Sequence, residues 1–519
     1  MLLTPISNDS FIQIFSRNDV RGVTSFKNLL SVQRFGDDWP SSDSDDPDYK
    51  PDHSRSDTDV DVAPCKNKCR RRKPIGDKVV SVHHNACTSS DSDTTDGDLW
   101  GKCIPHLVLL KIFHHVIESA GAAPFLCRAQ QVCRLWYECA SSCTLWKSVD
   151  LSFGWITAND ATLQLLCETR FSKLTDINLS NWKLLTASGL KLLADTCPQL
   201  KSINLSYCRV NSAGVLYMIN KCSNLTDIDL TSYYYNAAVN GKMFVHIVNK
   251  CSANLRSLNL SRNSPKGFSA VLRELAICCP NLECLDLSQN ANCLIPFSFD
   301  IERLQHGCPR LRILRLVNAN IEPARASLHD RDASPGFPEL RELSLGFTDP
   351  TTIFIGRTGI LYRLVKTSTK LKLLDLRGWP QLTCADLQSL PATDLAELYI
   401  SRCSVTKDEV LEILVAKWQH SLVELDVSWN NHSEAALDMA ARCLAGNPST
   451  SKLEVLNLGG TQISLGSVQR LLQGCPALHN LNLSSCRSLP RGIKREYFSS
   501  SLDHLRQNIA SSLSSDVCQ

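Results

Sequence analysis

Cysteine is the residue type in this sequence whose abundance most suggests chemistry, because a thiol can act as a nucleophile, bind a metal ion or form a disulfide. The 519 residues include 24 cysteines, a share of about 5% that lies below the roughly 8–10% of disulfide-stapled domains. The N-terminus lacks the continuous apolar segment of a secretory signal. We therefore expect reduced thiols in an intracellular protein, buried as small apolar side chains.

One group of cysteines and histidines could hold a metal ion. Cys65 and Cys69 precede His83, His84 and Cys87, and thiolates and imidazoles are the ligands that zinc prefers. Their spacing is irregular for a zinc motif, so we predict neither a metal site nor a cofactor. The sequence contains no Gly-rich phosphate loop and no nucleophile elbow, and local spacing supports no Cys–His relay. We therefore expect a protein that is not an enzyme.

Blocks of opposite charge separate the first hundred residues from the rest. Residues 41–62 contain eight Asp and two basic residues, and residues 65–78 contain seven Lys or Arg and one Asp. Such segments bury too little apolar surface to offset chain entropy. We expect residues 39–99 to be disordered and leave the order of residues 1–38 open. The net charge of +3 argues against a nucleic-acid-binding protein, and no apolar run is long enough to span a membrane.

The basic block could act as a nuclear localisation signal, because a flexible cationic strip fits an acidic receptor groove. Its basic residues are Lys66, Lys68, Arg70, Arg71, Arg72 and Lys73. The alternative is a solvated spacer that neutralises its acidic neighbours. The predicted location is nuclear, cytoplasmic or both.

A repeat occupies residues 151–489. An apolar residue, two variable residues, an apolar residue, one variable residue and a further apolar residue recur at steps of 24–31 residues. The opening residues are Leu174, Leu200, Leu225, Leu255, Leu282, Leu311, Leu340, Leu371, Leu395, Leu422, Leu453 and Leu478, with a leading copy at Trp146, Val149 and Leu151. This pattern indicates leucine-rich repeats, each a short strand followed by an amphipathic helix.

The predicted fold class is therefore α/β: a solenoid of thirteen strands in a curved parallel sheet with outer helices. Residues 490–519 are expected to form a C-terminal cap, with Leu502, Leu505 and Ile509 on a terminal helix over the last repeat. Residues 323–336 and 349–359 lengthen two repeats and are expected to protrude as loops.

Small polar residues recur at two positions of the repeat. Strands are followed by Cys208, Asn263, Asn290, Asn318, Cys403, Asn430 and Cys486. Helices end in Cys197, Cys222, Cys279, Cys308 and Cys475. We expect these side chains to satisfy backbone groups inside the solenoid. This phase resembles the cysteine-containing subtype of leucine-rich repeats, which is typical of F-box proteins.

Residues 100–150 have a different pattern. Pro105 suits the first turn of a helix, and Leu109, Ile112 and Phe113 follow at helical spacing. After a break at residues 119–124 a second helical stretch leads to Trp146. So small a helical unit cannot bury all of its large apolar side chains, and the surplus predicts a partner.

This block resembles the F-box in the order and spacing of its apolar residues. The resemblance implies a three-helix module that binds the Skp-type adaptor of an SCF ubiquitin ligase and, through it, the cullin and RING subunits. The residues expected to contact the adaptor are Pro105, Leu109, Leu110, Ile112, Phe113, Val132, Cys133, Trp136, Leu145 and Trp146. Family members usually carry an acidic residue where this chain has Leu107. The alternative is a block that only caps the solenoid.

The outward positions of the middle repeats could bind a protein substrate. The candidates are the cations Arg312, Arg315, Arg341, Lys372 and Arg377 and the aromatic residues Trp379, Tyr399 and Trp429. Guanidinium groups would hold an acidic or phosphorylated segment, and the aromatic rings would anchor apolar side chains. The alternative is a solvated surface with scattered charge.

The predicted function is that of the substrate-recognition subunit of an SCF-type E3 ligase, whose substrate is ubiquitinated and degraded by the proteasome. The chain would contribute proximity, and catalysis would belong to other subunits. The alternative is a leucine-rich-repeat scaffold or inhibitor that has no connection to ubiquitin.

Overall fold

The computed structural model describes residues 104–154, 156–231, 241–263, 267–290, 296–347, 359–379, 382–403, 409–449 and 451–516. The basic run at residues 66–73 and the possible zinc ligands at residues 65–87 lie outside the described residues, as do residues 349–358 of the second predicted loop. Within the described ranges, no three His, Cys, Asp or Glu side chains gather as a metal site would require.

Three helices open the described part of the chain. They are α2 (His106–Ala120), α3 (Ala122–Ala129) and α4 (Arg134–Ala140), followed by the 3₁₀ turn η1 (Cys143–Trp146). Gly121 separates the first two helices with a φ of 78°, a conformation that favours glycine. The predicted three-helix unit is confirmed.

The repeats contribute strands to one sheet, and the thirteen parallel strands that the described residues form follow chain order in it. These strands are β1 (Ser148–Asp150), β2 (Asp176–Asn178), β3 (Ser202–Asn204), β4 (Asp227–Asp229), β5 (Ser257–Asn259), β6 (Cys284–Asp286), β8 (Ile313–Arg315), β10 (Glu342–Ser344), β11 (Leu373–Asp375), β12 (Glu397–Tyr399), β13 (Glu424–Asp426), β14 (Val455–Asn457) and β15 (Asn480–Asn482). Their central residues pair with one another in register and point into the core. The predicted parallel sheet is confirmed.

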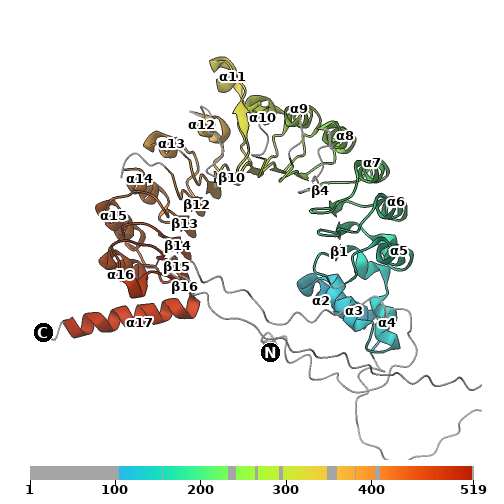
Figure 1. The fold of residues 1–519 in the computed structure, drawn as a ribbon, viewed down its shortest axis with the longest axis horizontal. Coiled ribbons are helices and arrows are strands. Elements are labelled where there is room, and N and C mark those ends of the chain that lie inside the picture. The colour runs from blue at the N-terminus through green and yellow to red at the C-terminus, as the bar shows by residue number, and fades with distance from the viewer. Residues whose placement is uncertain are drawn as a thin grey trace, which may run out of the picture. The chain divides into compact units, whose positions relative to one another are not determined.

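Helices cover the other side of the core, so that strands line the inner side of the curve of repeats and helices the outer side (Figure 1). They are α5 (Asp160–Thr169), α6 (Ala187–Thr196), α7 (Ser212–Lys221), α8 (Gly241–Cys251), α9 (Phe268–Cys278), α10 (Ile301–Gly307), α12 (Ile360–Val365), α13 (Cys384–Gln388), α14 (Glu409–Trp418), α15 (Glu434–Leu444) and α16 (Leu465–Gly474). In α6, for example, Thr186 caps the first turn and Leu190 and Leu193 are buried at helical spacing.

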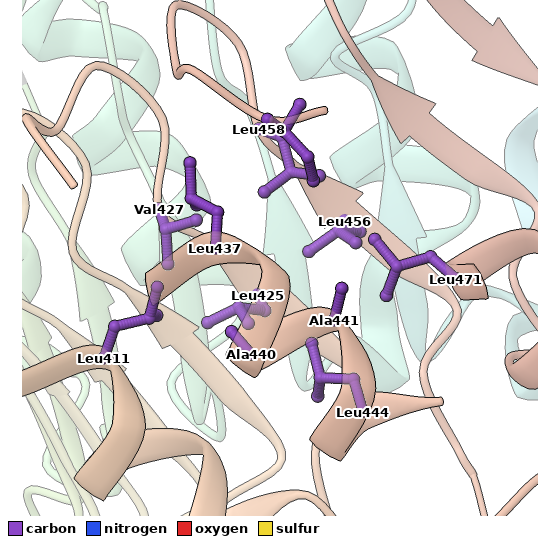
Figure 2. Close-up of a pocket in the computed structure, with 11 residues that line it drawn as sticks. Leu411, Leu425, Val427, Leu437, Ala440, Ala441, Leu444, Leu456, Leu458 and Leu471 are labelled. Carbon is purple, nitrogen blue, oxygen red and sulfur yellow. The ribbon is translucent and has the colours of Figure 1, made fainter. Parts of the chain in front are cut away.

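The core is closely packed. Figure 2 shows Leu425 and Leu456 from two neighbouring strands facing Leu437 and Ala441 of α15. The space between these side chains is about 10 Å³, which is barely enough for one water molecule. Its lining is entirely apolar, so it offers no hydrogen-bond partner and serves packing alone.

An insertion on either side of β8, between β6 and β10, departs from the regular repeat. β7 (Phe297–Phe299) and β9 (Ile321–Pro323) form a separate two-stranded parallel sheet. The short helix α11 (Leu328–Ala333) follows, held at its start by a capping box of Ser327 and Asp330. The first predicted loop, at residues 323–336, thus contains the end of a strand and a helix.

The small polar residues that follow the strands recur at the same position of successive repeats and donate hydrogen bonds. We call this series of side chains the donor column. Cys208 Sγ lies 3.0 Å from the Leu179 carbonyl oxygen and Cys403 Sγ 3.2 Å from that of Leu376, in each case one repeat earlier. Asn263 donates from Nδ2 to the equivalent carbonyl over 2.8 Å. The expected role is confirmed for these residues. Asn318, in contrast, lies one position earlier with a left-handed φ of 50°, and Ala319 occupies the column position.

Cysteines at the helix ends donate to the preceding repeat as well. Cys222 Sγ lies 3.6 Å from the Cys197 carbonyl, and Cys308 Sγ lies 3.6 Å from that of Leu275. Burial raises the pKa of Cys222 to about 11 and that of Cys308 to about 12. Both thiols therefore stay protonated, as donors, at neutral pH.

These thiols should resist alkylation. With N-ethylmaleimide at pH 8, we expect Cys222 and Cys308 to remain unmodified in the native protein, while the part-exposed Cys133 and Cys384 react. Mass spectrometry of peptides from native and denatured samples provides the measurement. Because the folded-state pKa lies above the ordinary value of 9.0, deprotonation favours unfolding, and stability should fall as the pH rises from 9 toward 12. Rapid native modification of Cys308 would contradict its assignment as a buried donor.

The C-terminal end is closed by a different arrangement. After the 3₁₀ turn η3 (Arg491–Ile493), β16 (Glu496–Phe498) pairs antiparallel with β15, and α17 (Ser499–Asp516) buries Leu502 and Leu505. The predicted terminal helix is confirmed, and the Ile509 side chain lies outside the description. Of the helices that the structure describes, none is long and apolar enough to cross a membrane.

Candidate adaptor and substrate surfaces

Large apolar side chains project into solvent from the start of α2. Leu107 is 71% exposed, Val108 47% and Ile112 42%. Val108 and Ile112 are one helical turn apart and share a face. We call these three residues the α2 surface. Contiguous exposed apolar side chains on a small helical unit indicate a binding surface.

The predicted adaptor residues fall into two groups. Pro105 and Ile112 are exposed, as is Val132 in the turn before α4, whereas Leu110, Cys133 and Trp136 are half-buried. The remaining four are Leu109, Phe113, Leu145 and Trp146, each at most 1% exposed. We predicted that these four residues contact the adaptor directly, but their side chains lie in the core of the helical unit.

Aromatic packing explains this burial. The Phe113 ring meets Phe125 and Trp136 edge to face, with centroids 5.0 and 5.1 Å apart. This arrangement is favourable beyond the area that it buries. The core of the unit thus fixes α2 so that its opposite face stays exposed.

Trp146 joins the helices to the first repeat. Its indole Nε1 donates to the Ala140 carbonyl over 2.8 Å, and its ring lies 6.4 Å from the Phe171 ring of the following repeat. The helical unit therefore shares a core with the solenoid, as a cap would, while its α2 surface remains exposed.

Comparison with known proteins identifies this unit, because the family model described as F-box-like matches residues 102–152. The chain carries an F-box-like domain followed by leucine-rich repeats. The match includes α2, α3, α4 and β1, and so the whole α2 surface of the F-box-like domain.

Several curated proteins resemble parts of this chain. The DNA repair protein rhp7 of Schizosaccharomyces pombe is 24% identical over 52% of this chain and 46% of its own length. F-box/LRR-repeat protein 4 of Bos taurus is 26% identical over 55% of this chain and 44% of its own. F-box protein SKIP19 of Arabidopsis thaliana is 24% identical over 34% and 57%. The chain thus spans about half the length of the curated relatives it matches.

Among solved structures, the yeast Rad7 and Elc1 complex covers 75% of this chain and 92% of the matched chain at 17% identity, with a TM-score of 0.45. An internalin from Listeria monocytogenes covers 62% of this chain and 76% of its own at 19% identity, with a TM-score of 0.37.

The cations predicted to form a basic patch on the repeats have carboxylate partners. Arg312 bonds Glu283 at 2.7 Å, and Arg315 makes a bidentate pair with Glu342 of the adjacent strand. Such pairing holds the guanidinium groups and neutralises them.

The remaining three cations differ in their partners. Arg377 makes a bidentate pair with Asp375, at 2.7 and 2.9 Å, and Lys372 donates to the backbone carbonyl of Asp394 over 2.9 Å. Arg341 is exposed and has no ion pair among the described residues. Three of the five cations are therefore paired with carboxylates, and substrate binding by these five residues stays a prediction.

The three predicted aromatic anchors also differ. Trp379 is buried. Tyr399 is half-buried, with its hydroxyl donating to Glu397 over 3.0 Å and the Arg377 guanidinium 5.4 Å from its ring centroid. Trp429 is 55% exposed, so it is the anchor that can offer most of its ring to a partner.

A hollow of about 300 Å³ lies beside Trp429, where β11, β12 and β13 end. Arg377, Arg402 and Asp426 contribute charged groups to its lining, and Phe347 a second aromatic ring. We call it the Trp429 hollow. Sequence reasoning missed Arg402, although its position seven residues after the repeat opening at Leu395 is the one that Trp429 holds after Leu422.

Proposed function

We propose that this chain is the substrate-recognition subunit of an SCF-type E3 ubiquitin ligase. The F-box-like domain would bind a Skp-type adaptor, and through it the cullin and RING subunits, while the repeats hold a protein substrate. The observation that carries this proposal is the α2 surface, which leaves three large apolar side chains in water on a domain that matches the F-box-like family.

The docking contact would use the exposed face of the domain. Ile112, Val108 and Leu107 would enter an apolar groove of the adaptor, with Pro105 and Val132 beside them. The half-buried Leu110, Cys133 and Trp136 would line the edge of the contact. Leu107 adds apolar area where an acidic residue is usual in the family, so it would tilt this interface toward hydrophobic contacts.

The shared core at Trp146 supports a role in positioning. A substrate held by the repeats would stand at a fixed place relative to the adaptor, which raises the effective concentration of its lysines near the activated ubiquitin. Ubiquitination and proteasomal degradation of the substrate would follow, with the chemistry supplied by other subunits. Entry into the nucleus through residues 66–73 remains a prediction.

A pull-down with purified Skp-type adaptor tests the proposal. We expect wild type to retain the adaptor, and Val108→Asp with Ile112→Asp to weaken binding by about 100-fold or more, because each aspartate would bury an unpaired charge in an apolar contact. Leu184→Asp is the matched control. Leu184 is an apolar residue of the repeats that is 69% exposed, and its replacement should leave adaptor binding unchanged.

Two outcomes would overturn the proposal in different ways. If wild type fails to retain the adaptor, the ligase function is abandoned in favour of a leucine-rich-repeat scaffold or inhibitor. If the double variant binds as tightly as wild type, the α2 surface is not the docking site.

A further inference from the structure

The residue seven positions after each repeat opening adopts a left-handed backbone through most of the solenoid. The non-glycine residues there are Asn181, Tyr207, Arg262, Gln289, Asn318, Arg402, Trp429 and Ser485, with φ between 50° and 65°. Glycine fills the same position at Gly378 and Gly460. Side chains other than glycine adopt this conformation at a cost of about 1–2 kcal/mol. Trp429 adopts it although its exposed ring adds little to the core.

Two glycines hold the left-handed position in repeats close to this tryptophan. A Cβ on Gly378 would lie 1.9 Å from the Phe347 carbonyl oxygen, and a Cβ on Gly460 would lie 2.7 Å from the Trp429 ring. Equivalent positions of adjacent parallel strands are about 4.8 Å apart. The row Phe347, Gly378, Arg402, Trp429 therefore places an empty position between an aromatic side chain and a guanidinium, and the Trp429 hollow opens there.

The charged side chains that line the hollow differ in whether they already have a partner within the protein. Asp375 holds Arg377 in a bidentate pair, and the Asp426 carboxylate accepts hydrogen bonds from both the amide and the hydroxyl of Ser428, at 3.0 and 2.7 Å. Arg402 is exposed and has no ion pair within the described ranges. It is therefore the available cation at the rim.

Carboxylates also lie nearby on the sheet. Glu397 and Glu424 face each other on β12 and β13, at the opposite ends of these strands from the hollow. Tyr399 lies between them and the turn, and its hydroxyl donates to Glu397. These carboxylates act on the far side of Tyr399, whereas Arg402 lines the hollow itself.

We propose that the Trp429 hollow binds a substrate segment in which a carboxylate or phosphate group adjoins an aromatic or aliphatic residue. The apolar side chain would lie against Trp429 and Phe347, and the anion would be held by Arg402. This inference rests on the proposed function of the repeats as a substrate receptor. The sequence predicted that the cations of the middle repeats bind an anion. We instead assign the anion to Arg402, in the row that contains Trp429.

Peptide selection on the purified full chain tests the specificity directly. A phage library of random heptapeptides is panned against wild type and against Arg402→Glu. We expect wild type to enrich Asp or Glu beside an aromatic or aliphatic residue, and Arg402→Glu to enrich Lys or Arg at that place instead. Arg262→Glu is the control, because Arg262 is an exposed arginine at the same left-handed position of another repeat; it should give the wild-type motif.

Synthetic peptides then distinguish the anions. The enriched peptide, its phosphoserine analogue and its glutamine analogue are compared by fluorescence polarisation. We expect the glutamine analogue to bind about tenfold more weakly than whichever anion is preferred, and Trp429→Ala to weaken all three by about tenfold or more. Thermal melting checks that each variant is folded.

An enriched motif without an anionic position, the same motif from Arg402→Glu as from wild type, or no motif at all would overturn this inference. The selection uses no adaptor, so its failure leaves the adaptor pull-down unaffected, and a failed pull-down leaves the selection interpretable.

Discussion

Replacing Arg363 with methionine should lower the free energy of unfolding by about 3–5 kcal/mol, because it leaves the buried carboxylate of Glu302 without its partner. The two side chains are each 9% exposed and make a bidentate pair at 2.5 and 2.7 Å between α10 and α12. Arg363 also donates to the Ala324 carbonyl over 3.0 Å, so the same loss would loosen the insertion that contains α11.

Chemical denaturation of two further variants separates the effect of ion pairing from that of packing. Glu302→Met with Arg363→Met removes both charges and should recover much of the loss, since a buried ion pair can be exchanged for apolar packing at little cost. Arg303→Met, at an exposed position of α10, should change stability by less than about 0.5 kcal/mol. A single Arg363→Met variant as stable as the control would show that the pair contributes nothing.

The pair also predicts a pH dependence. Burial is the largest effect and opposes ionisation of Glu302, but hydrogen bonds from Arg363 and from the backbone, together with the charges of Arg363 and Arg331, outweigh it and lower the pKa of Glu302 below its ordinary value of 4.5. The folded state therefore binds a proton less readily than the unfolded chain. The stabilisation is complete above pH 4.5 and is lost as the pH falls through the lowered pKa, and this loss should be absent from the double methionine variant.

Trp146→Ala should destabilise the junction between the F-box-like domain and the first repeat by about 3–5 kcal/mol. The substitution opens a cavity beside Phe171 and leaves the Ala140 carbonyl without its indole donor. Hydrogen exchange should show lost protection in α4, η1 and β1, with repeats far from the junction less affected.

The control for this substitution is Trp429→Ala, the same chemical change at an exposed ring. It should alter stability by less than about 0.5 kcal/mol. Trp146→Phe, which keeps one aromatic ring but loses the hydrogen bond and part of the buried area, should fall between the two. Equal effects of the alanine substitutions at Trp146 and Trp429 would contradict the assignment of Trp146 to a shared core.

The repeating leucines were sufficient to predict the solenoid. Leu174 and each later opening residue are buried, and α6 and α16 bury side chains at helical spacing, as the predicted amphipathic helices require. These features depend on periodicity, which a single sequence displays directly. The column of Cys and Asn donors was predictable for the same reason, apart from the one-residue error at Asn318.

The candidate sites were predicted less well, because they depend on neighbours that are distant in the sequence. The partner of Arg315 is 27 residues away and that of Arg363 is 61, so cations that suggested a basic patch are neutralised by carboxylates whose register only the fold reveals. Phe113 and Ile112 are adjacent and equally apolar, yet the orientation of α2 buries one and exposes the other. The Trp429 ring lies against Gly460 of the next repeat, and Gly378, two repeats earlier, lines the hollow beside it.

The donor column has a direction that matters while the chain is being made. Cys208 and Cys403 donate to carbonyls of the repeat that precedes their own, and Trp182 donates in the same sense to the Leu151 carbonyl at the edge of the F-box-like domain. A ribosome releases the N-terminal end first. The repeats that contain Trp182, Cys208 and Cys403 therefore emerge after their acceptors, and they can be added in translation order to an array that begins at the F-box-like domain.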